Sequence, residues 1–294
     1  MQLEAFAKIN WTLDITGVRE DGYHLMDMLM QPVSIADEIT LNPAPDIRIT
    51  TSGIPRSRAD ETNLAWRAAQ ALKEVSGYSG GVDIHVHKTI PIGAGMGGGS
   101  ADAAAVLKGL NQLWKIGLSQ GELENVGLQL GADVPFLLRG GLARVRGIGE
   151  KMEIYDDEHN WWLVITQPCG GLSTARIFSL WKSEEVAHRP DTDRALEALQ
   201  TGDLAAFSTA IGNVLQPAAS SLRPEIDETC NLLRSLGASA ACMTGSGSAV
   251  FGVFSTRMLA QKASQKLSGR LKKTFLCHSQ HDSIRLVGNQ EAEA

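Results

Sequence analysis

Hydrophobic and polar residues alternate over the first fifteen positions of the chain. One side of the alternation carries Leu3, Ala5, Ala7, Ile9, Trp11 and Leu13, and the other carries Glu4, Phe6, Lys8, Asn10, Thr12 and Asp14. A period of two residues predicts a β-strand over Leu3–Ile15, with the second of these sides as its polar face. Residues Val82–Lys88 alternate in the same way and predict another strand.

Further along the chain, apolar residues recur with the spacing of a helix face. The predicted helices are Ala65–Val75, Ala101–Trp114, a segment from Glu122 to near Gly131, Asp193–Leu199 and Leu204–Ile211. Two more strands are predicted at Trp161–Thr166 and Ala249–Phe254, the latter as the last strand of the chain. Strands and helices that mix without regular βα alternation indicate an α+β fold.

Charged and turn-forming residues gather at Glu153–Asn160, and we place a domain boundary there. A chain of 294 residues with 43% hydrophobic content is large enough for two domains, predicted at 1–155 and 156–294. The tail Asn289–Ala294 is expected to fray.

Charge and composition exclude several classes of protein. A net charge of -6 without a cluster of Lys or Arg argues against a nucleic-acid partner. The N-terminus lacks the pattern of a signal peptide and no apolar run could span a bilayer, so we expect a cytoplasmic protein without a membrane partner. The four cysteines have no metal-binding or disulfide spacing, which predicts buried free thiols. Monomer and homodimer remain equally open.

The stretch "PIGAGMGGGSAD" (Pro91–Asp102) places five glycines in seven positions between a predicted strand and a predicted helix. It contains GxGxxG, but the next segment is helical where a dinucleotide-binding fold needs a second parallel strand. It lacks the lysine of a Walker A loop. Backbone N–H groups left bare at a helix N-terminus are suited to phosphate, which favours a phosphate-binding loop over a flexible linker.

Other residues permit both a structural and a chemical interpretation. Lys8 fits a solvated lysine on the polar face of its strand, and Asp133 fits a turn or helix-capping residue as well as a catalytic carboxylate. Tyr23 and His24 could anchor a loop or bind a base. His85 and His87 share one strand face, but no third ligand for a metal has useful spacing.

Three blocks together resemble the GHMP kinase superfamily, which binds ATP through a glycine-rich loop. They are the glycine-rich stretch, "AKINWTLDITGVREDGYH" and "MTGSGSAVFGVF", so the resemblance covers nearly the whole chain. Lys8-Ile9-Asn10 followed by Gly17, Arg19 and Asp21-Gly22-Tyr23-His24 is similar to one branch, which acts on a cytidine-diphospho sugar alcohol. Trp11 and Met96 replace apolar residues usual in that branch, which affects packing and not chemistry.

The resemblance implies a two-domain α+β fold, with an N-terminal domain like the second domain of ribosomal protein S5 and a ferredoxin-like C-terminal domain. It implies that ATP with Mg²⁺ phosphorylates the 2-hydroxyl of the sugar alcohol in the non-mevalonate isoprenoid pathway. Lys8 and Asp133 match the catalytic pair, in which the carboxylate orients or deprotonates the hydroxyl.

The resemblance also assigns the binding residues. The ATP site would comprise Pro91, Ile92, Gly93, Ala94, Gly95, Met96, Gly97, Gly98, Gly99, Ser100 and Ala101, with Lys88 and Asn63, although the last two and Ser100 also fit surface or capping residues. The alcohol site would comprise Asn10, Tyr23, His24, Asp133, Thr174, Phe178, Gly245 and Ser246. No protein ligand for the metal is predicted.

Three alternatives remain beside this interpretation. A sister kinase acting on homoserine or mevalonate would not need Tyr23, His24 or Phe178 for a base. A nicotinamide-dependent oxidoreductase would use the GxGxxG motif, and a ligand sensor would keep the scaffold without catalysis.

Overall fold

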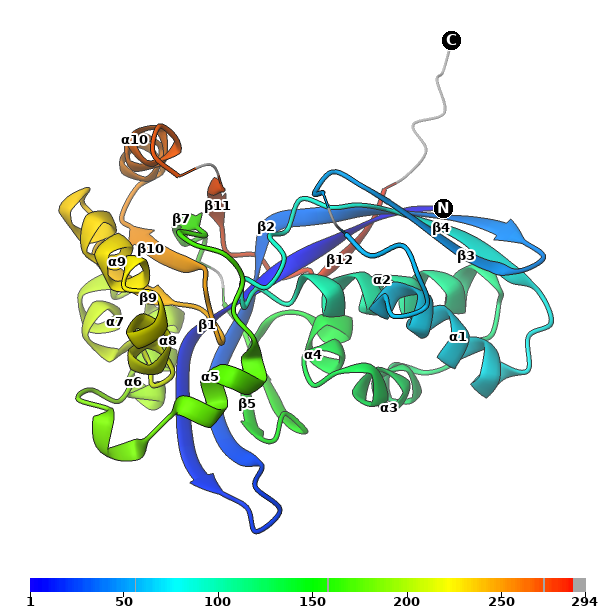
Figure 1. Cartoon of the computed structure of the whole chain (residues 1–294), viewed down its shortest axis with the longest axis horizontal. Helices are drawn as coiled ribbons and strands as arrows, with labels where there is room; N and C mark the ends of the chain where they lie inside the picture. The colour runs from blue at the N-terminus through cyan, green and yellow to red at the C-terminus, as the bar shows by residue number, and fades with distance from the viewer. Residues whose placement is uncertain (56, 158, 272, 288–294) are drawn as a thin grey trace.

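The computed structural model describes residues 1–55, 57–157, 159–271 and 273–287. Its larger sheet has eight strands, and four helices cover one face of it (Figure 1). The strands are β1 (Gln2–Val18), β2 (His24–Ala44), β3 (Ile47–Ser52), β4 (Gly81–His87), β5 (Leu142–Gly147), β6 (Lys151–Tyr155), β8 (Gly212–Asn213) and β12 (Ile284–Val287). The helices are α1 (Leu64–Ser76), α2 (Gly98–Leu113), α3 (Gln120–Leu130) and α4 (Val134–Arg139).

A second sheet of four antiparallel strands has the order β11-β7-β10-β9. Its strands are β7 (Trp162–Thr166), β9 (Ala240–Met243), β10 (Val250–Phe254) and β11 (Thr274–His278). The helices of this half of the chain are α5 (Thr174–Leu180), α6 (Thr192–Thr201), α7 (Leu204–Ala210), α8 (Gln216–Leu222), α9 (Glu225–Ser235) and α10 (Arg257–Ser268), with a 3-10 turn η1 at Ser183–Glu185. Helices α9 and α10 contact this sheet.

The strands β1 and β2 form a long antiparallel hairpin whose register shifts at three places. Its far end projects from the body of the molecule toward α5 (Figure 1). Because bulges bend and twist a strand pair, the hairpin can pair with strands from both halves of the molecule. It pairs with β4 and β12 at one level and with β5 and β8 further along.

The expected elements are largely present, although several boundaries differ. All five predicted helices and all four predicted strands occur, and α2 begins three residues earlier than expected, inside the glycine-rich stretch. The expectation that Ala249–Phe254 is the last strand was wrong, because β11 and β12 follow it. The alternation also failed to indicate β2, the longest strand of the chain. The tail from Asn289 lies outside the described residues.

The first strand does not have the polar face that was predicted for it. Every residue from Ala5 to Leu13 is buried, and Lys8 is only 4% exposed, so the interpretation of Lys8 as a solvated lysine was wrong. The reason is that β1 lies between two layers, with α2 on one side and elements of the second half on the other. Trp11, for example, packs edge-on against Phe207 and Phe251.

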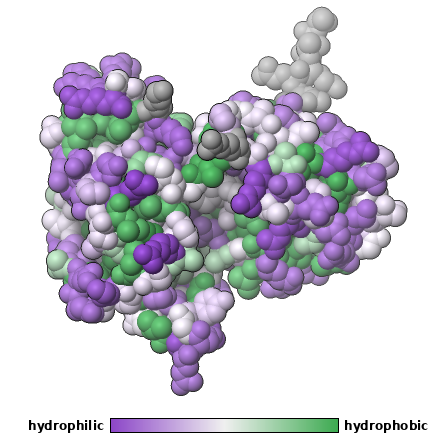
Figure 2. All heavy atoms as spheres, in the orientation of Figure 1, coloured by the Kyte–Doolittle hydropathy of each residue, from purple (hydrophilic) through white to green (hydrophobic). Residues whose placement is uncertain are grey.

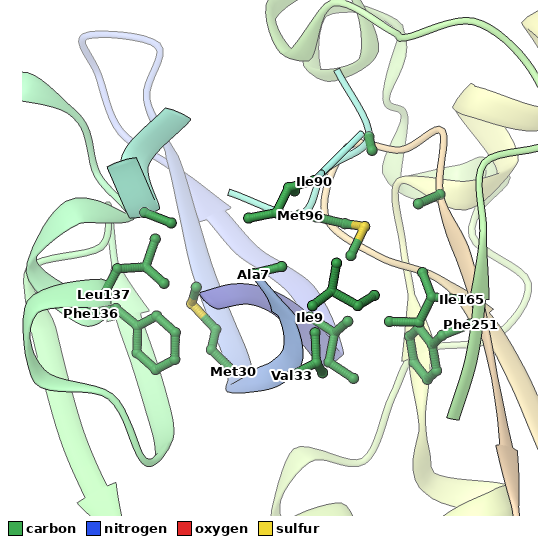
Figure 3. Packing of buried hydrophobic residues seen from close by; sticks show 14 of the residues in the cluster. Ala7, Ile9, Met30, Val33, Ile90, Met96, Phe136, Leu137, Ile165 and Phe251 are labelled. Atoms are coloured by element: carbon green, nitrogen blue, oxygen red, sulfur yellow. The ribbon is translucent and has the colours of Figure 1, made fainter. Parts of the chain in front are cut away.

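One hydrophobic cluster therefore continues through both halves of the chain. Figure 3 shows Ala7 and Ile9 of β1 at its centre, with Phe136 and Leu137 to one side and Ile165 and Phe251 to the other. Burying such side chains is worth about 1.5–3 kcal/mol each, so this continuity fixes the two halves against each other. None of the helices that the structure describes combines the length and apolar character needed to cross a membrane.

Candidate active site

A cavity of ≈ 560 Å³ opens where the glycine-rich stretch meets β1, α4, α5 and the turn between β9 and β10. Figure 2 shows the surface hollowed between the part that carries α1–α4 and the part that carries α5–α10. Lining residues include every predicted site residue except three, Tyr23, His24 and Ala101. Positions from both halves of the sequence thus converge on one space large enough for a small-molecule substrate.

The glycine loop, defined here as Pro91–Ala101, leads from β4 into α2. Helix α2 begins after Gly97, which has a left-handed φ of 70° and provides no side-chain cap. Ser100 also fitted a capping residue, but no side chain caps this helix. The first N–H groups of α2 therefore remain available beside the cavity, where the positive end of the helix dipole favours an anion.

Close packing also explains some of the glycines. A Cβ at Gly98 would stand 2.9 Å from Ile90, and a Cβ at Gly97 would stand 3.1 Å from the Lys8 side chain. The loop runs directly over β1, where the Lys8 N–H donates to the Met96 carbonyl at 3.0 Å. Bare backbone is thus required both toward the cavity and toward the strand beneath.

Lys8 and Asp133 meet at the floor of the cavity, although 125 positions of the sequence separate them. The Lys8 Nζ lies 3.5 Å from Asp133 Oδ2 and donates to Asn10 Oδ1 at 2.7 Å. The Lys8 side chain is buried, whereas that of Asp133 keeps 34% of its surface exposed. Asp133 is the N-cap residue of α4, but its carboxylate makes no capping bond, so that carboxylate is free to face a ligand.

Polar side chains join the turn between β9 and β10 to this floor. The Asn10 N–H donates to Thr244 Oγ1 at 2.9 Å, and Thr174 Oγ1 lies 2.8 Å from Ser246 Oγ. The Asn213 amide donates to the carbonyl of Met243 at the end of β9 and to that of Gly245 in the same turn. These bonds fix Gly245 and Ser246 against the cavity, where both are lining residues.

Aromatic rings gather at the end of the cavity nearest the hairpin tip. The ring of His24 lies 5.1 Å from that of Phe178 and 5.5 Å from that of Trp181, with interplanar angles of 50° and 86°. Tyr23 lies in the turn of the hairpin with 62% of its surface exposed. Phe178 belongs to α5, and one face of this helix, with Thr174 and Phe178, borders the cavity.

Asn63 and Lys88 are both engaged in bonds within the protein. Asn63 caps α1, accepting from the Ala65 N–H at 2.9 Å, and also lines the cavity. Lys88 is buried, and its Nζ donates to Asp37 and, at 2.6 Å, to Asp102 Oδ2. Burial alone would lower the pKa of Lys88, but the two carboxylates outweigh it and raise the pKa.

The sequence did not point to several residues near the site. Arg58 and Thr62 line the cavity from the segment before α1, Trp181 contacts His24, and Asp37 binds Lys88. Nothing in the sequence around Arg58 and Thr62 distinguishes them from ordinary surface residues. Asp37 lies in strand β2, which was not predicted. The segment "VSIADEITL" alternates, and Asp37 stands on its apolar side between Ile35 and Ile39, which is the signal that could have identified it.

The two histidines of β4 are hydrogen-bonded to residues of the neighbouring strand β3. His85 and His87 share Ser52 Oγ, at 3.0 Å and 2.9 Å, and His85 also contacts Thr50. Among the described residues no group of three metal-ligating side chains is found. Likewise, α2 leads into α3 and not into a parallel strand, which is not the order of a dinucleotide-binding fold.

Comparisons with known proteins agree with this geometry. The family model "GHMP kinases N terminal domain" matches residues 63–141, and "GHMP kinases C terminal" matches residues 195–273. A solved structure of a homoserine kinase from Cytophaga hutchinsonii shares the fold, with a TM-score of 0.76 at 19% identity over 98% of this chain and 97% of that one. A solved structure of mevalonate kinase from L. major also shares it, with a TM-score of 0.71 at 16% identity over 96% of each chain. The fold and the site thus define a GHMP kinase.

Relatives of higher identity narrow the family further. The 4-diphosphocytidyl-2-C-methyl-D-erythritol kinase of Alkaliphilus metalliredigens is 40% identical over 283 residues, which cover 95% of this chain and 96% of the relative. A crystal structure of 4-(cytidine 5'-diphospho)-2C-methyl-D-erythritol kinase superposes with a TM-score of 0.81 at 34% identity, over 95% of this chain and 99% of that one. The chain belongs to the 4-diphosphocytidyl-2-C-methyl-D-erythritol kinase family.

Proposed function

We propose that this protein transfers the γ-phosphoryl group of ATP to the 2-hydroxyl of 4-diphosphocytidyl-2-C-methyl-D-erythritol, a step in non-mevalonate isoprenoid precursor synthesis. The observation that carries the proposal is the position of the Lys8–Asp133 pair, in the same cavity as the glycine loop and Phe178. Phosphoryl transfer depends mainly on positioning and on charge stabilisation, and this cavity offers both.

The reaction forms a bond between the substrate hydroxyl oxygen and the γ-phosphorus, and it breaks the bond from that phosphorus to the β,γ-bridging oxygen, which leaves with ADP. Asp133 orients the hydroxyl and accepts its proton. Lys8, held by Asn10 at 2.7 Å, lies 3.5 Å from Asp133 Oδ2 and stabilises negative charge on the attacking oxygen.

The glycine loop would hold the phosphates of ATP through its N–H groups and the N-terminus of α2, with Asn63 nearby. Mg²⁺ usually takes one or two protein oxygens and is otherwise held by phosphates and water, so the hydroxyl of Ser100 at this end of the cavity fits such a complex. When bound, the metal would neutralise charge on the phosphates.

At the other end, the cytosine of the substrate would stack on Phe178, with His24 beside it at the base edge. Tyr23 would reach the base from the hairpin turn. Asn10, Thr174, Gly245 and Ser246 line the space between the base and the catalytic pair, which fits the diphosphate and the erythritol.

We also propose the division into domains 1–155 and 156–294. It is supported by the second sheet, whose strands all come from the later segment. The domains share structure, because β8 and β12 of the later segment pair with β1.

The proposed function is tested by coupling ADP release to a spectroscopic assay with a panel of acceptors. The panel contains the cytidine-diphospho substrate, its uridine analogue, 2-C-methylerythritol phosphate, homoserine and mevalonate. Turnover with the cytidine-diphospho substrate at least an order of magnitude above all others is expected. Equal turnover of an acceptor without a base would assign the protein to a sister kinase.

A further inference from the structure

Three charged side chains, Asp37, Lys88 and Asp102, meet behind the glycine loop and have no role in the chemistry described above. All three are buried, with exposures of 0%, 7% and 2%. They come from β2, from the residue directly after β4, and from the start of α2. Burying charges is costly unless they are paired, so such a cluster requires an explanation.

Asp37 binds the chain at the entry to the loop. One carboxylate oxygen, Oδ1, accepts from the N–H groups of Thr89 at 2.6 Å and Ile90 at 2.9 Å. The other, Oδ2, accepts from Lys88 Nζ. Both oxygens are thus occupied, and a single side chain on β2 holds three consecutive residues that lead into Pro91. Ile90, the last of them, lies in the hydrophobic core near Met96 (Figure 3).

Lys88 extends this connection to the exit of the loop. Its Nζ donates to Asp102 Oδ2 at 2.6 Å, and Asp102 lies in the first turns of α2, directly after Ala101. The ammonium lies beneath Gly98, whose Cβ, if present, would stand 3.5 Å from it. The entry and the exit of the glycine loop are therefore tied together through one buried ammonium group.

The two oxygens of Asp102 differ in their surroundings. Oδ2 binds Lys88, whereas Oδ1 is buried without a hydrogen-bond partner in the part of the chain that the structure describes. Burial raises the pKa of Asp102 well above its ordinary value against the effect of Lys88, and the nearby Asp37 raises it further.

We propose that Asp37, Lys88 and Asp102 form an ionic latch that holds the two ends of the glycine loop at the separation that ATP requires. Lys88 is then a positioning residue that acts through the loop and not a phosphate contact. This inference rests on the proposed function, since it takes the loop as the ATP site. A loop displaced by about 1 Å can cost about 10²-fold in rate, so the latch has a measurable effect.

Asp37 uses both of its carboxylate oxygens and Asp102 uses one, so the same substitution should affect the two residues differently. In Asp37→Asn, an amide NH₂ replaces an acceptor that is in use, so either the Lys88 bond or the two bonds from Thr89 and Ile90 are lost. In Asp102→Asn, the carbonyl can still face Lys88 while the NH₂ occupies the position of the unpartnered Oδ1. We therefore expect Asp37→Asn and Asp102→Ala to raise the KM for ATP roughly 10- to 100-fold, and Asp102→Asn to change it less than about threefold.

The matched control is Gln31→Met on the same strand. Gln31 is also buried and accepts from Trp11 Nε1 at 2.7 Å while donating to Asp157 at 2.8 Å, but it does not line the cavity. This variant should lose stability without a change in the KM for ATP. The KM for the alcohol should stay within about twofold in all the variants, because the latch lies at the ATP end.

Hydrogen exchange of residues 91–101 provides a readout that needs no substrate, and faster exchange is expected in Asp37→Asn and Asp102→Ala but not in Asp102→Asn. Equal increases in both KM values, or unchanged loop exchange in Asp37→Asn and Asp102→Ala, would overturn the latch. If wild type itself fails to use ATP, the proposed function falls, while the exchange data still decide whether the latch exists. Should Asp37→Asn not fold, the comparison of Asp102→Ala with Asp102→Asn remains decisive.

Discussion

The carbonyl oxygen of Thr244 lies where a side chain on Gly95 would begin: a Cβ on Gly95 would stand 2.3 Å from it. The glycine loop therefore contacts the turn between β9 and β10 through bare backbone on both sides, since a Cβ on Gly245 would likewise stand 2.6 Å from the Gly95 carbonyl oxygen. The loop is both a candidate phosphate site and part of the contact between the two halves of the molecule.

Replacing Gly95 by Ala should lower stability and weaken ATP binding together. Gly95 has a φ of +76°, and a non-glycine residue there costs about 1–3 kcal/mol before the contact with Thr244 is counted. Thermal unfolding and steady-state kinetics measure the two effects. Gly121→Ala is the control, because its Cβ would meet open space in α3 and should leave both quantities unchanged or raise stability slightly. A Gly95→Ala variant as stable as wild type would contradict the packing argument.

Asp133→Asn should reduce kcat by about 10² to 10⁴ while both substrates still bind. The amide keeps the shape of the side chain but cannot accept the hydroxyl proton, and α4 should be unaffected because Asp133 makes no capping bond. Kinetics and equilibrium binding of a non-hydrolysable ATP analogue separate the two effects. The exposed Asp46→Asn variant should behave as wild type. Near-full turnover in Asp133→Asn would remove Asp133 from the mechanism.

Phe178→Ala should weaken the cytidine substrate about 5- to 150-fold, since a stacked base contributes about 1–3 kcal/mol. Tyr23→Ala is expected in the same range, which requires the hairpin turn to bring Tyr23 from its exposed position onto the base. Titration of each variant with the cytidine substrate, at saturating ATP, measures the KM for that substrate. An unchanged KM in Tyr23→Ala would show that Phe178 stacks the base without it.

His24→Ala should cost discrimination more than affinity. A hydrogen bond to the base edge distinguishes cytosine from uracil, and stacking does not. The ratio of kcat/KM for the cytidine and uridine forms of the substrate should fall toward one in this variant. If wild type already treats both bases alike, His24 has no such role.

Three of the four cysteines should resist modification in the folded protein. Burial raises the pKa of Cys230 to about 12 and raises those of Cys242 and Cys277 as well, so little reactive thiolate exists near neutral pH. Cys169 is only half-buried, although burial raises its pKa too. A thiol reagent at pH 8 should label at most Cys169 quickly and all four cysteines in denaturant. Rapid labelling that persists in Cys169→Ser would contradict this burial.

The spacing of apolar residues was enough to predict those helices and strands that bury a single face. Helix α1, with Ala65, Ala68, Ala69 and Leu72 inward, was predicted within one residue at each end. Strand β2 was not predicted because Met28–Val33 is buried on both faces and has no period of two, although Val33–Leu41 alternates. Asp37 lies in the alternating part, at a buried position between Ile35 and Ile39 where the pattern favours an apolar residue.

The sequence by itself determined the phosphate-suited glycine loop, the α+β class and the family resemblance, because these depend on residues that are adjacent in the chain. Only the tertiary structure decided that Lys8 is buried and 3.5 Å from Asp133, and that Lys88 is bound by Asp37 and Asp102. The physical reason is that the fate of a charged side chain depends on which distant elements cover it. Strand β1 acquires a second buried face only when the later half of the chain packs against it, and no local pattern records that contact.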